Sequence, residues 1–208
     1  MRPSVPALFI TFAGVMSVVT VANAQSCLTQ LSQIAQIDRP EPVQASEPAC
    51  VIPEQVRLIS TKETVPVAFS DKPILDCPFA LKLTRFTTNR IQPLAEFHLG
   101  TKVTTIATGP GFVCRRRNNR PDGKLSEHAF GNAVDITTMK FANGEHFEVK
   151  QKALQQPPAA AFQASIRREA CVFFTTVIGP GTNDAHATHL HLDLGRSKDN
   201  PNPYRICE

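Results

Sequence analysis

Residues 189–194 read HLHLDL, a strict alternation of polar and leucine side chains. This alternation predicts a β-strand with one polar and one buried face, because successive side chains of a strand point to opposite sides of the sheet. His189, His191 and Asp193 would share the polar face. Three polar side chains on one face of a core strand cost free energy unless something pairs with them. The stretch therefore predicts both a sheet and a polar site on it.

A second polar patch, SEHAFGNAVD, occupies residues 126–135. From 131 to 137, small or polar residues alternate with apolar ones, which predicts a second strand. Asp135 would lie among small side chains, and His128, just before the strand, could fold over the same space from a loop. If the strands pair, these two residues meet one histidine of the first stretch. Two imidazoles, a carboxylate and an open fourth position are expected of a catalytic zinc site.

The rest of the chain reads as short strands and helices in irregular order. Further strands are predicted at 56–59, 102–107, 145–149 and 172–178. Helices are predicted at 77–86, 93–100 and 157–171. The order is too irregular for a wound parallel sheet. The predicted fold class is therefore α+β, a small antiparallel sheet with flanking helices.

The composition is that of an ordinary globular chain with one core: 208 residues, 42% apolar and 19% charged. Plentiful Val, Ile, Leu and Phe argue against disorder. A net charge of +4 is too small to indicate a nucleic-acid partner. His98 and His146 stand outside the two patches, and we expect them to be ordinary polar residues.

The amino terminus carries the pattern of a secretory signal peptide over residues 1–24. Arg2 precedes an apolar stretch, and Ala22-Asn23-Ala24 supplies a small-x-small cleavage pattern. An uncleaved membrane anchor is the alternative. No other segment is apolar enough to span a bilayer. We therefore expect an exported protein of the periplasm or cell envelope, with no membrane contact after cleavage.

All six cysteines follow this segment. No two of them stand at metal-ligand spacing, and an exported chain meets an oxidising compartment. They therefore predict up to three disulfides rather than a cysteine zinc site, although spacing does not choose among the pairings. Residues 25–49 are polar and proline-rich, so we expect an arm or linker there. The disulfide-stabilised domain would then span 50–208.

The pattern Ser126-x-His128-x-x-Gly131-x-Ala133-x-Asp135, with a later His-x-His, resembles the signature of zinc D-Ala-D-Ala carboxypeptidases and murein endopeptidases. That group shares its fold with Hedgehog signalling domains. Residues 50–208 more closely resemble the bacterial extensin-like C-terminal family, which is related to those peptidases. The matching stretches include FVCRRR, LSEHAFGNAVDI, VIGPG and HLHLDLG. The resemblance implies a Hedgehog/DD-peptidase-like fold and peptidoglycan peptides as the partner.

Residue by residue, the resemblance implies a zinc ion on His128, Asp135 and His191. It also implies that Ser126 and an arginine of the preceding loop hold the carboxylate of the substrate. Arg115 is the simplest choice, and the two arginines after it compete for the role. A planar guanidinium suits a bidentate carboxylate contact.

The chain departs from the related peptidases at one position. Many of them carry an acidic general base three residues before the last ligand, where this chain has Thr188. Endopeptidases with a His-x-His pattern place a histidine two residues before the ligand, and His189 fills that place. A histidine there can take a proton from water, and His186 would assist it or act as an alternative base.

These observations predict an exported zinc metallopeptidase that hydrolyses amide bonds at D-amino acids in peptidoglycan stem peptides. The substitution at Thr188 keeps a non-catalytic, metal-containing cell-wall-binding domain as the alternative. A third reading retains the histidines as structural residues without a metal.

Overall fold

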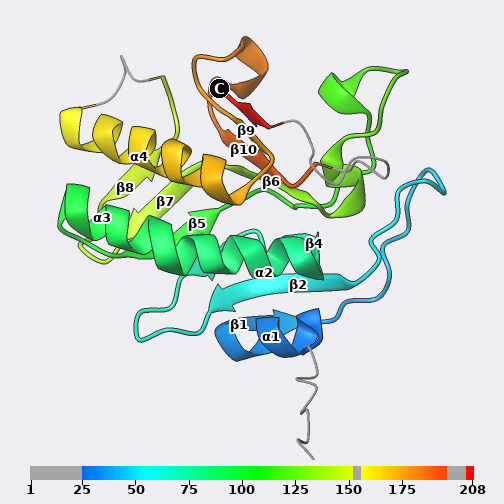
Figure 1. Ribbon diagram of the computed structural model, residues 1–208, viewed down its shortest axis with the longest axis horizontal. Helices are drawn as coiled ribbons and strands as arrows, with labels where there is room; N and C mark the ends of the chain where they lie inside the picture. The colour runs from blue at the N-terminus through cyan, green and yellow to red at the C-terminus, as the bar shows by residue number, and fades with distance from the viewer. Residues whose placement is uncertain (1–24, 152–155, 196–204) are drawn as a thin grey trace, which may run out of the picture.

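The computed structural model describes residues 25–151, 156–195 and 205–208, so the signal peptide expected at 1–24 lies outside the described residues. The strands form two sheets, with helices packed against them (Figure 1). The larger sheet has the order β1-β2-β3-β5-β7-β8, with β4 paired to β2, and the smaller has the order β11-β9-β10-β6. The larger sheet comprises β1 (Ala35–Asp38), β2 (Gln55–Thr61), β3 (Ala68–Phe69), β4 (Ile74–Asp76), β5 (Val103–Ala107), β7 (Thr138–Phe141) and β8 (His146–Glu148). The smaller comprises β6 (Ala133–Ile136), β9 (Thr176–Ile178), β10 (Leu190–Asp193) and β11 (Ile206–Cys207).

Both sheets are mixed, which corrects the expected antiparallel sheet within the α+β class. Most neighbours pair antiparallel, but β3 pairs with β5, and β11 with β9, in parallel. Parallel neighbours cannot be joined by a tight hairpin and need a longer crossover. Two helices lie in the chain between β3 and β5, and β10 lies between β9 and β11. Strands this short give little sequence signal from which to read their direction.

Helices α2 (Cys77–Phe86), α3 (Gln92–Leu99) and α4 (Pro157–Phe173) cover the sheets, and α2 and α3 run in line across the front of Figure 1. A π-helical turn, Thr87–Ile91, joins α2 to α3. Phe79 and Phe86 of α2 contact Phe174, with ring centroids 5.8 and 5.3 Å apart. The predicted helices at 77–86 and 93–100 are confirmed, and the aromatic side chains of α2 are buried in the core.

The predicted strand at 172–178 is wrong at its start. Helix α4 continues through Phe173, and β9 begins only at Thr176. Apolar residues fit a buried strand and the buried side of a helix equally well by pattern. The tertiary contact decides between them, because the ring of Phe173 packs on that of Phe86 with centroids 5.2 Å apart.

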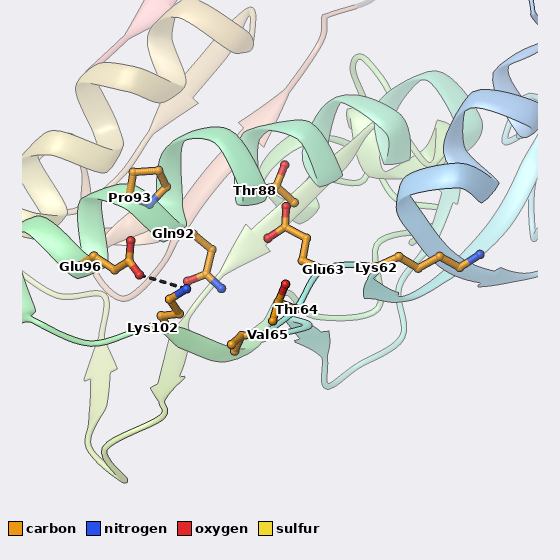
Figure 2. Close-up of a pocket in the computed structure, with 9 residues that line it drawn as sticks. All are labelled: Lys62, Glu63, Thr64, Val65, Thr88, Gln92, Pro93, Glu96 and Lys102. Atoms are coloured by element: carbon orange, nitrogen blue, oxygen red, sulfur yellow. Dashed lines mark ion pairs between the residues drawn. The ribbon is translucent and has the colours of Figure 1, made fainter.

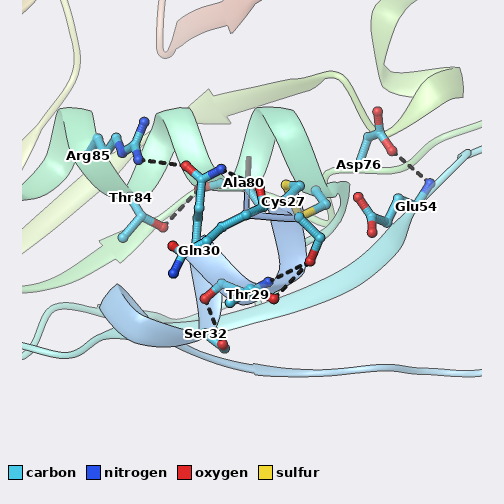
Figure 3. The surroundings of a disulfide bond; sticks show 12 residues. Cys27, Thr29, Gln30, Ser32, Glu54, Asp76, Ala80, Thr84 and Arg85 are labelled. Carbon is cyan, nitrogen blue, oxygen red and sulfur yellow. Dashed lines mark hydrogen bonds between the residues drawn. A yellow bond between two sulfur atoms is a disulfide. The ribbon is translucent and has the colours of Figure 1, made fainter. Parts of the chain in front are cut away.

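Residues 25–49, expected to be an arm or linker, contain secondary structure that packs on the domain. Helix α1 (Cys27–Ile34) buries Leu31, and β1 pairs antiparallel with β2. A disulfide joins Cys27 to Cys77 at the start of α2 (Figure 3). The expectation is wrong for residues 27–38, because the prolines of this segment lie only after β1 and the disulfide partner of Cys27 could not be read from spacing; residues 39–49 form neither helix nor strand.

The expected disulfides are present, and all six cysteines are used. The other two bonds are Cys50–Cys114 and Cys171–Cys207. Within the described residues, no helix combines the length and apolar character needed to cross a bilayer.

Candidate metal centre

Strands β6 and β10 pair antiparallel and bring the two polar patches together. In this register His191 lies directly opposite Asp135. The leucines of β10, Leu190 and Leu192, are buried on the other face of the sheet, as the alternation predicts. The pairing therefore fixes an imidazole and a carboxylate side by side on one sheet face.

His128 reaches the same place from a 3-10 turn, Glu127–Phe130, where the sequence predicted a loop. Ser126 caps this turn, and its Oγ accepts the backbone N–H of His128 at 3.4 Å. Gly131 ends the turn with φ of +63°, and a Cβ at this position would lie 2.7 Å from the backbone nitrogen of Asp76. Glycine meets both the positive φ and the close approach. The turn thereby holds the imidazole of His128 above β6.

Asp135 lies between the two histidines. Its Oδ2 is 3.2 Å from His128 Nε2, and its Oδ1 is 2.9 Å from His191 Nδ1. One ligand atom from each of the three residues lies within 4.8 Å of the other two. The three residues named by the sequence therefore converge as a set that one metal ion could occupy.

The hydrogen bond of one ring nitrogen of His128 determines which nitrogen faces Asp135 and His191. His128 Nδ1 lies 2.8 Å from the carbonyl oxygen of Gly111, which only accepts, so Nδ1 carries the hydrogen. In the neutral ring Nε2 then presents a lone pair. This buried Nε2 makes no hydrogen bond of acceptable geometry, although Asp135 is close. A lone pair and a carboxylate facing each other fit a cation between them, so the residues fit a bound metal.

The charges of the group are strongly coupled. Burial alone would raise the pKa of Asp135, but the two adjacent imidazoles, those of His128 and His191, outweigh it and hold that pKa well below its usual range. Burial alone would lower the pKa of His191, but hydrogen bonds to Asp135 and Asp193 raise it to about 9. Without a metal, the centre keeps a proton on His191 between two carboxylates.

The centre opens into a cleft of about 480 Å³ that also contains His186 and His189. His189 Nε2 is 3.6 Å from Asp135 Oδ1, and the ring of His186 lies 5.1 Å from that of His189. Asn183 Oδ1 lies 2.7 Å from His186 Nδ1. Burial is the main cause that lowers the pKa of both histidines. Both therefore favour the neutral form, which can accept a proton.

The comparison with protein families gives one match. The family described as Extensin-like protein C-terminus matches residues 25–208. The chain belongs to this family. No curated protein and no solved structure matches it. The match begins at residue 25, which agrees with the packing of α1 and β1 on the domain.

The three consecutive arginines at residues 115–117, here called the arginine loop, point to two different sides. Arg115 and Arg117 line the cleft. Arg116 instead donates to Glu47 Oε2 at 2.9 Å and to the carbonyl oxygen of Gly123 at 2.7 Å. Its backbone is extended, and neighbouring side chains of extended chain point to opposite sides. Arg116 therefore points away from the cleft and is not a candidate for binding the substrate carboxylate. Ser126 lines the cleft and also caps the turn that carries His128.

Two residues of the site were not among the predicted site residues. Asp193 Oδ2 lies 3.0 Å from His191 Nε2, and Glu127 buries its carboxylate beside the cleft. Asp193 could have been found from its place on the polar face of the HLHLDL strand. Glu127 gives no such signal, because a glutamate before a histidine is as typical of a solvated turn.

The extensin-like domain has a second hollow beside α3, of about 530 Å³ (Figure 2). Its charged and polar groups are largely engaged with the protein itself. Lys102 pairs with Glu96 at 3.2 Å, Lys62 Nζ donates to the carbonyl oxygen of Ser32, and the Gln92 amide holds the backbone of Val103. Among the described residues, the groups of side chains that could hold a metal lie outside this hollow, so the cleft is the stronger candidate site.

Proposed function

We propose that this extensin-like domain is an exported zinc metallopeptidase that hydrolyses amide bonds at D-amino acids in peptidoglycan stem peptides. One observation carries the proposal: the buried Nε2 of His128, without a well-formed hydrogen bond, faces Asp135 and His191. A structural histidine would be expected to satisfy that atom. The resemblance to zinc D-Ala-D-Ala peptidases supplies the reaction class and the substrate.

The residues that would hold zinc are His128 through Nε2, Asp135 through its carboxylate and His191 through Nδ1. Imidazole and carboxylate are ligands that zinc accepts, and three protein ligands leave a position open. When bound, the ion would supply a Lewis acid that activates water and polarises the scissile carbonyl.

In this proposal His189 would accept and return the proton. Burial lowers its pKa, so the ring is neutral at pH 7 and can accept a proton from the attacking water. His186 stands next to it, with ring centroids 5.1 Å apart, and would assist it or act as an alternative base. After water has attacked the amide carbonyl, the protonated His189 would return the proton to the leaving amine.

Arg115 supports the choice of a substrate that carries a carboxylate. It lines the same cleft as His189 and Ser126, so a peptide carboxylate bound to the guanidinium would lie beside the centre. The serine hydroxyl, already the cap of the turn, would donate its hydrogen to the same carboxylate.

Export is supported by the disulfides. The described residues contain the bonds Cys27–Cys77, Cys50–Cys114 and Cys171–Cys207. Such bonds persist in oxidising compartments and are rare in the cytosol. They agree with a periplasmic or cell-envelope location.

The test is zinc analysis of untagged protein together with mass spectrometry of muropeptide products. We expect about one zinc per chain, and products that disappear in His191→Ala while the fold, followed by circular dichroism, is kept. His146→Ala is the matched control, because His146 is an exposed histidine on β8 in the other sheet. Equal turnover by both variants, or none by the wild type, would overturn the proposal.

A second function, a metal-containing cell-wall-binding domain without turnover, is favoured by one observation. Thr188 is exposed and puts no acidic group where related peptidases carry their base. Retention of the zinc-loaded protein on peptidoglycan with no products released would select this function instead.

A further inference from the structure

The cleft contains a buried carboxylate that the proposed mechanism does not use. The Glu127 side chain is 5% exposed, directly before the ligand His128 in the 3-10 turn. Its Oε2 accepts a hydrogen bond from Asn132 Nδ2 at 2.9 Å. A buried carboxylate is costly unless a positive group balances it.

Arg117 is a positive group beside this carboxylate. Its Nη2 lies 3.7 Å from Glu127 Oε1, and its side chain is 57% exposed. The buried carboxylate of Glu127 therefore orients the guanidinium of Arg117, which remains accessible from the cleft that both residues line. A guanidinium has five N–H donors in a rigid fork, so one contact with Glu127 leaves donors for a ligand.

Arg117 and Arg115 lie on the same side of the loop. The extended backbone at Arg116 turns the middle arginine toward Glu47 and leaves its neighbours facing the cleft. Residues two apart in an extended chain are separated by roughly 7 Å. That distance separates the two Cα atoms, and each arginine side chain is long enough to bring its guanidinium to one carboxylate of the same short amino acid.

We infer that Arg117, held by Glu127, forms a second carboxylate subsite in the cleft. The preferred leaving residue then carries a side-chain carboxylate in addition to the α-carboxylate held by Arg115. This rests on the proposed function for the identity of the ligand as a peptide end. It goes beyond that function in naming a dicarboxylic residue, rather than a neutral one, as the specific leaving group.

The test compares D-glutamate with D-glutamine, which have the same shape and differ in one charge. Binding of the two free amino acids to zinc-loaded protein is followed by NMR titration. In parallel, kcat/KM is measured for acetyl-D-Ala-D-Glu and acetyl-D-Ala-D-Gln. Because Arg117 is partly exposed and screened, we expect a preference of about fivefold for the acid in both measurements.

Arg117→Gln should bring this ratio to about one, because the values for the D-glutamate ligands fall toward those for the D-glutamine ligands. Arg116→Gln is the matched control and should keep the wild-type ratio, because Arg116 contacts Glu47 and Gly123 instead of lining the cleft. A double-mutant cycle tests the positioning role. Any effect of Glu127→Gln on the ratio should vanish when Arg117 is already glutamine.

The outcomes separate this inference from the proposed function. A wild-type ratio of one, or an unchanged ratio in Arg117→Gln, overturns the second subsite even if both dipeptides are hydrolysed. Absence of hydrolysis overturns the peptidase and leaves the amino-acid titration to decide the subsite. A preference in the titration that depends on Arg117 then supports it by binding alone.

Discussion

The imidazole of His191 directs its Nε2 toward Asp193 Oδ2 at 3.0 Å. The other oxygen of the same carboxylate accepts the backbone N–H of Gly195 at 2.8 Å. Asp193 is itself buried, so the protein holds both of its oxygens in place. The hydrogen bond keeps a hydrogen on Nε2 of His191 and turns Nδ1 toward Asp135. An outer carboxylate of this kind sets the ring orientation of a metal ligand.

Asp193→Asn should therefore weaken zinc binding by about 10- to 100-fold while the fold is kept. Gly195 and His191 donate to different oxygens of Asp193, and the amide replaces one of these oxygens with an NH2 donor, so one of the two hydrogen bonds is lost. Zinc affinity is measured by competition with a chelator. Asp71→Asn is the control, since Asp71 accepts the backbone N–H of Thr108 at 2.9 Å and touches no proposed ligand. Equal zinc affinity in the Asp193 variant and the wild type would contradict the role.

The metal-free protein should lose stability as the pH rises from about 6.5 to about 9. Folding raises the pKa of His191 from 6.5 to about 9, because hydrogen bonds to Asp135 and Asp193 outweigh the opposing effect of burial. A raised histidine pKa contributes stability fully below the unfolded value, and that stability disappears above the folded value. The contribution amounts to roughly 3 kcal/mol. Unfolding in urea from pH 6 to 9.5 measures it.

His191→Gln supplies the comparison for that measurement. It removes the titrating ring, so the free energy of unfolding should change little over the same pH range. Zinc should flatten the profile of the wild type in a similar way, because the ion takes the place of the proton. A steep alkaline loss that survives in His191→Gln would show that another group causes it.

Gly131→Ala should destabilise the domain by roughly 2 kcal/mol or more. Its φ of +63° is unfavourable for alanine, and the new Cβ would lie 2.7 Å from a backbone nitrogen at Asp76. Gly144→Ala is the matched control, with φ of +86° but no atom within 4 Å of the new Cβ. The difference between the two variants in urea unfolding isolates the close approach. If both variants lost the same free energy of unfolding, the close approach of residue 131 to the backbone of Asp76 would not contribute to stability.

Replacing Cys50 and Cys114 together by serine should lower the free energy of unfolding by about 2–4 kcal/mol. It should also expose the arginine loop to protease, because Cys114 directly precedes Arg115. The same double replacement at Cys171 and Cys207 is the control and should leave cleavage of that loop unchanged. Unfolding in urea and limited proteolysis with mass spectrometry give the two readouts.

The centre of the site was predictable because it depends on local patterns. The alternation of HLHLDL and of residues 131–137 specified which side chains share a face, and the predicted pairing of these strands brings His191 opposite Asp135. A strict two-residue period survives any tertiary environment in which one sheet face is buried. The family resemblance then distinguished His191 from His189 as the expected ligand.

What surrounds the centre was less predictable because it depends on contacts between distant residues. The carbonyl of Gly111 that fixes the ring of His128 is 17 residues away in sequence. The pairing of Cys27 with Cys77, which secures α1, spans 50 residues. The parallel contacts of β3 and β11 likewise follow from the course of the chain rather than from a local period.

The disulfide Cys50–Cys114 also divides the cleft into two differently anchored halves. The proposed metal ligands sit on β6, β10 and a turn, none of which contains a cysteine. The arginines that line the cleft directly follow Cys114, which is tied to Cys50. Under the proposed function, reduction of this bond would therefore loosen the arginines that hold the substrate before it reaches the residues that would hold zinc.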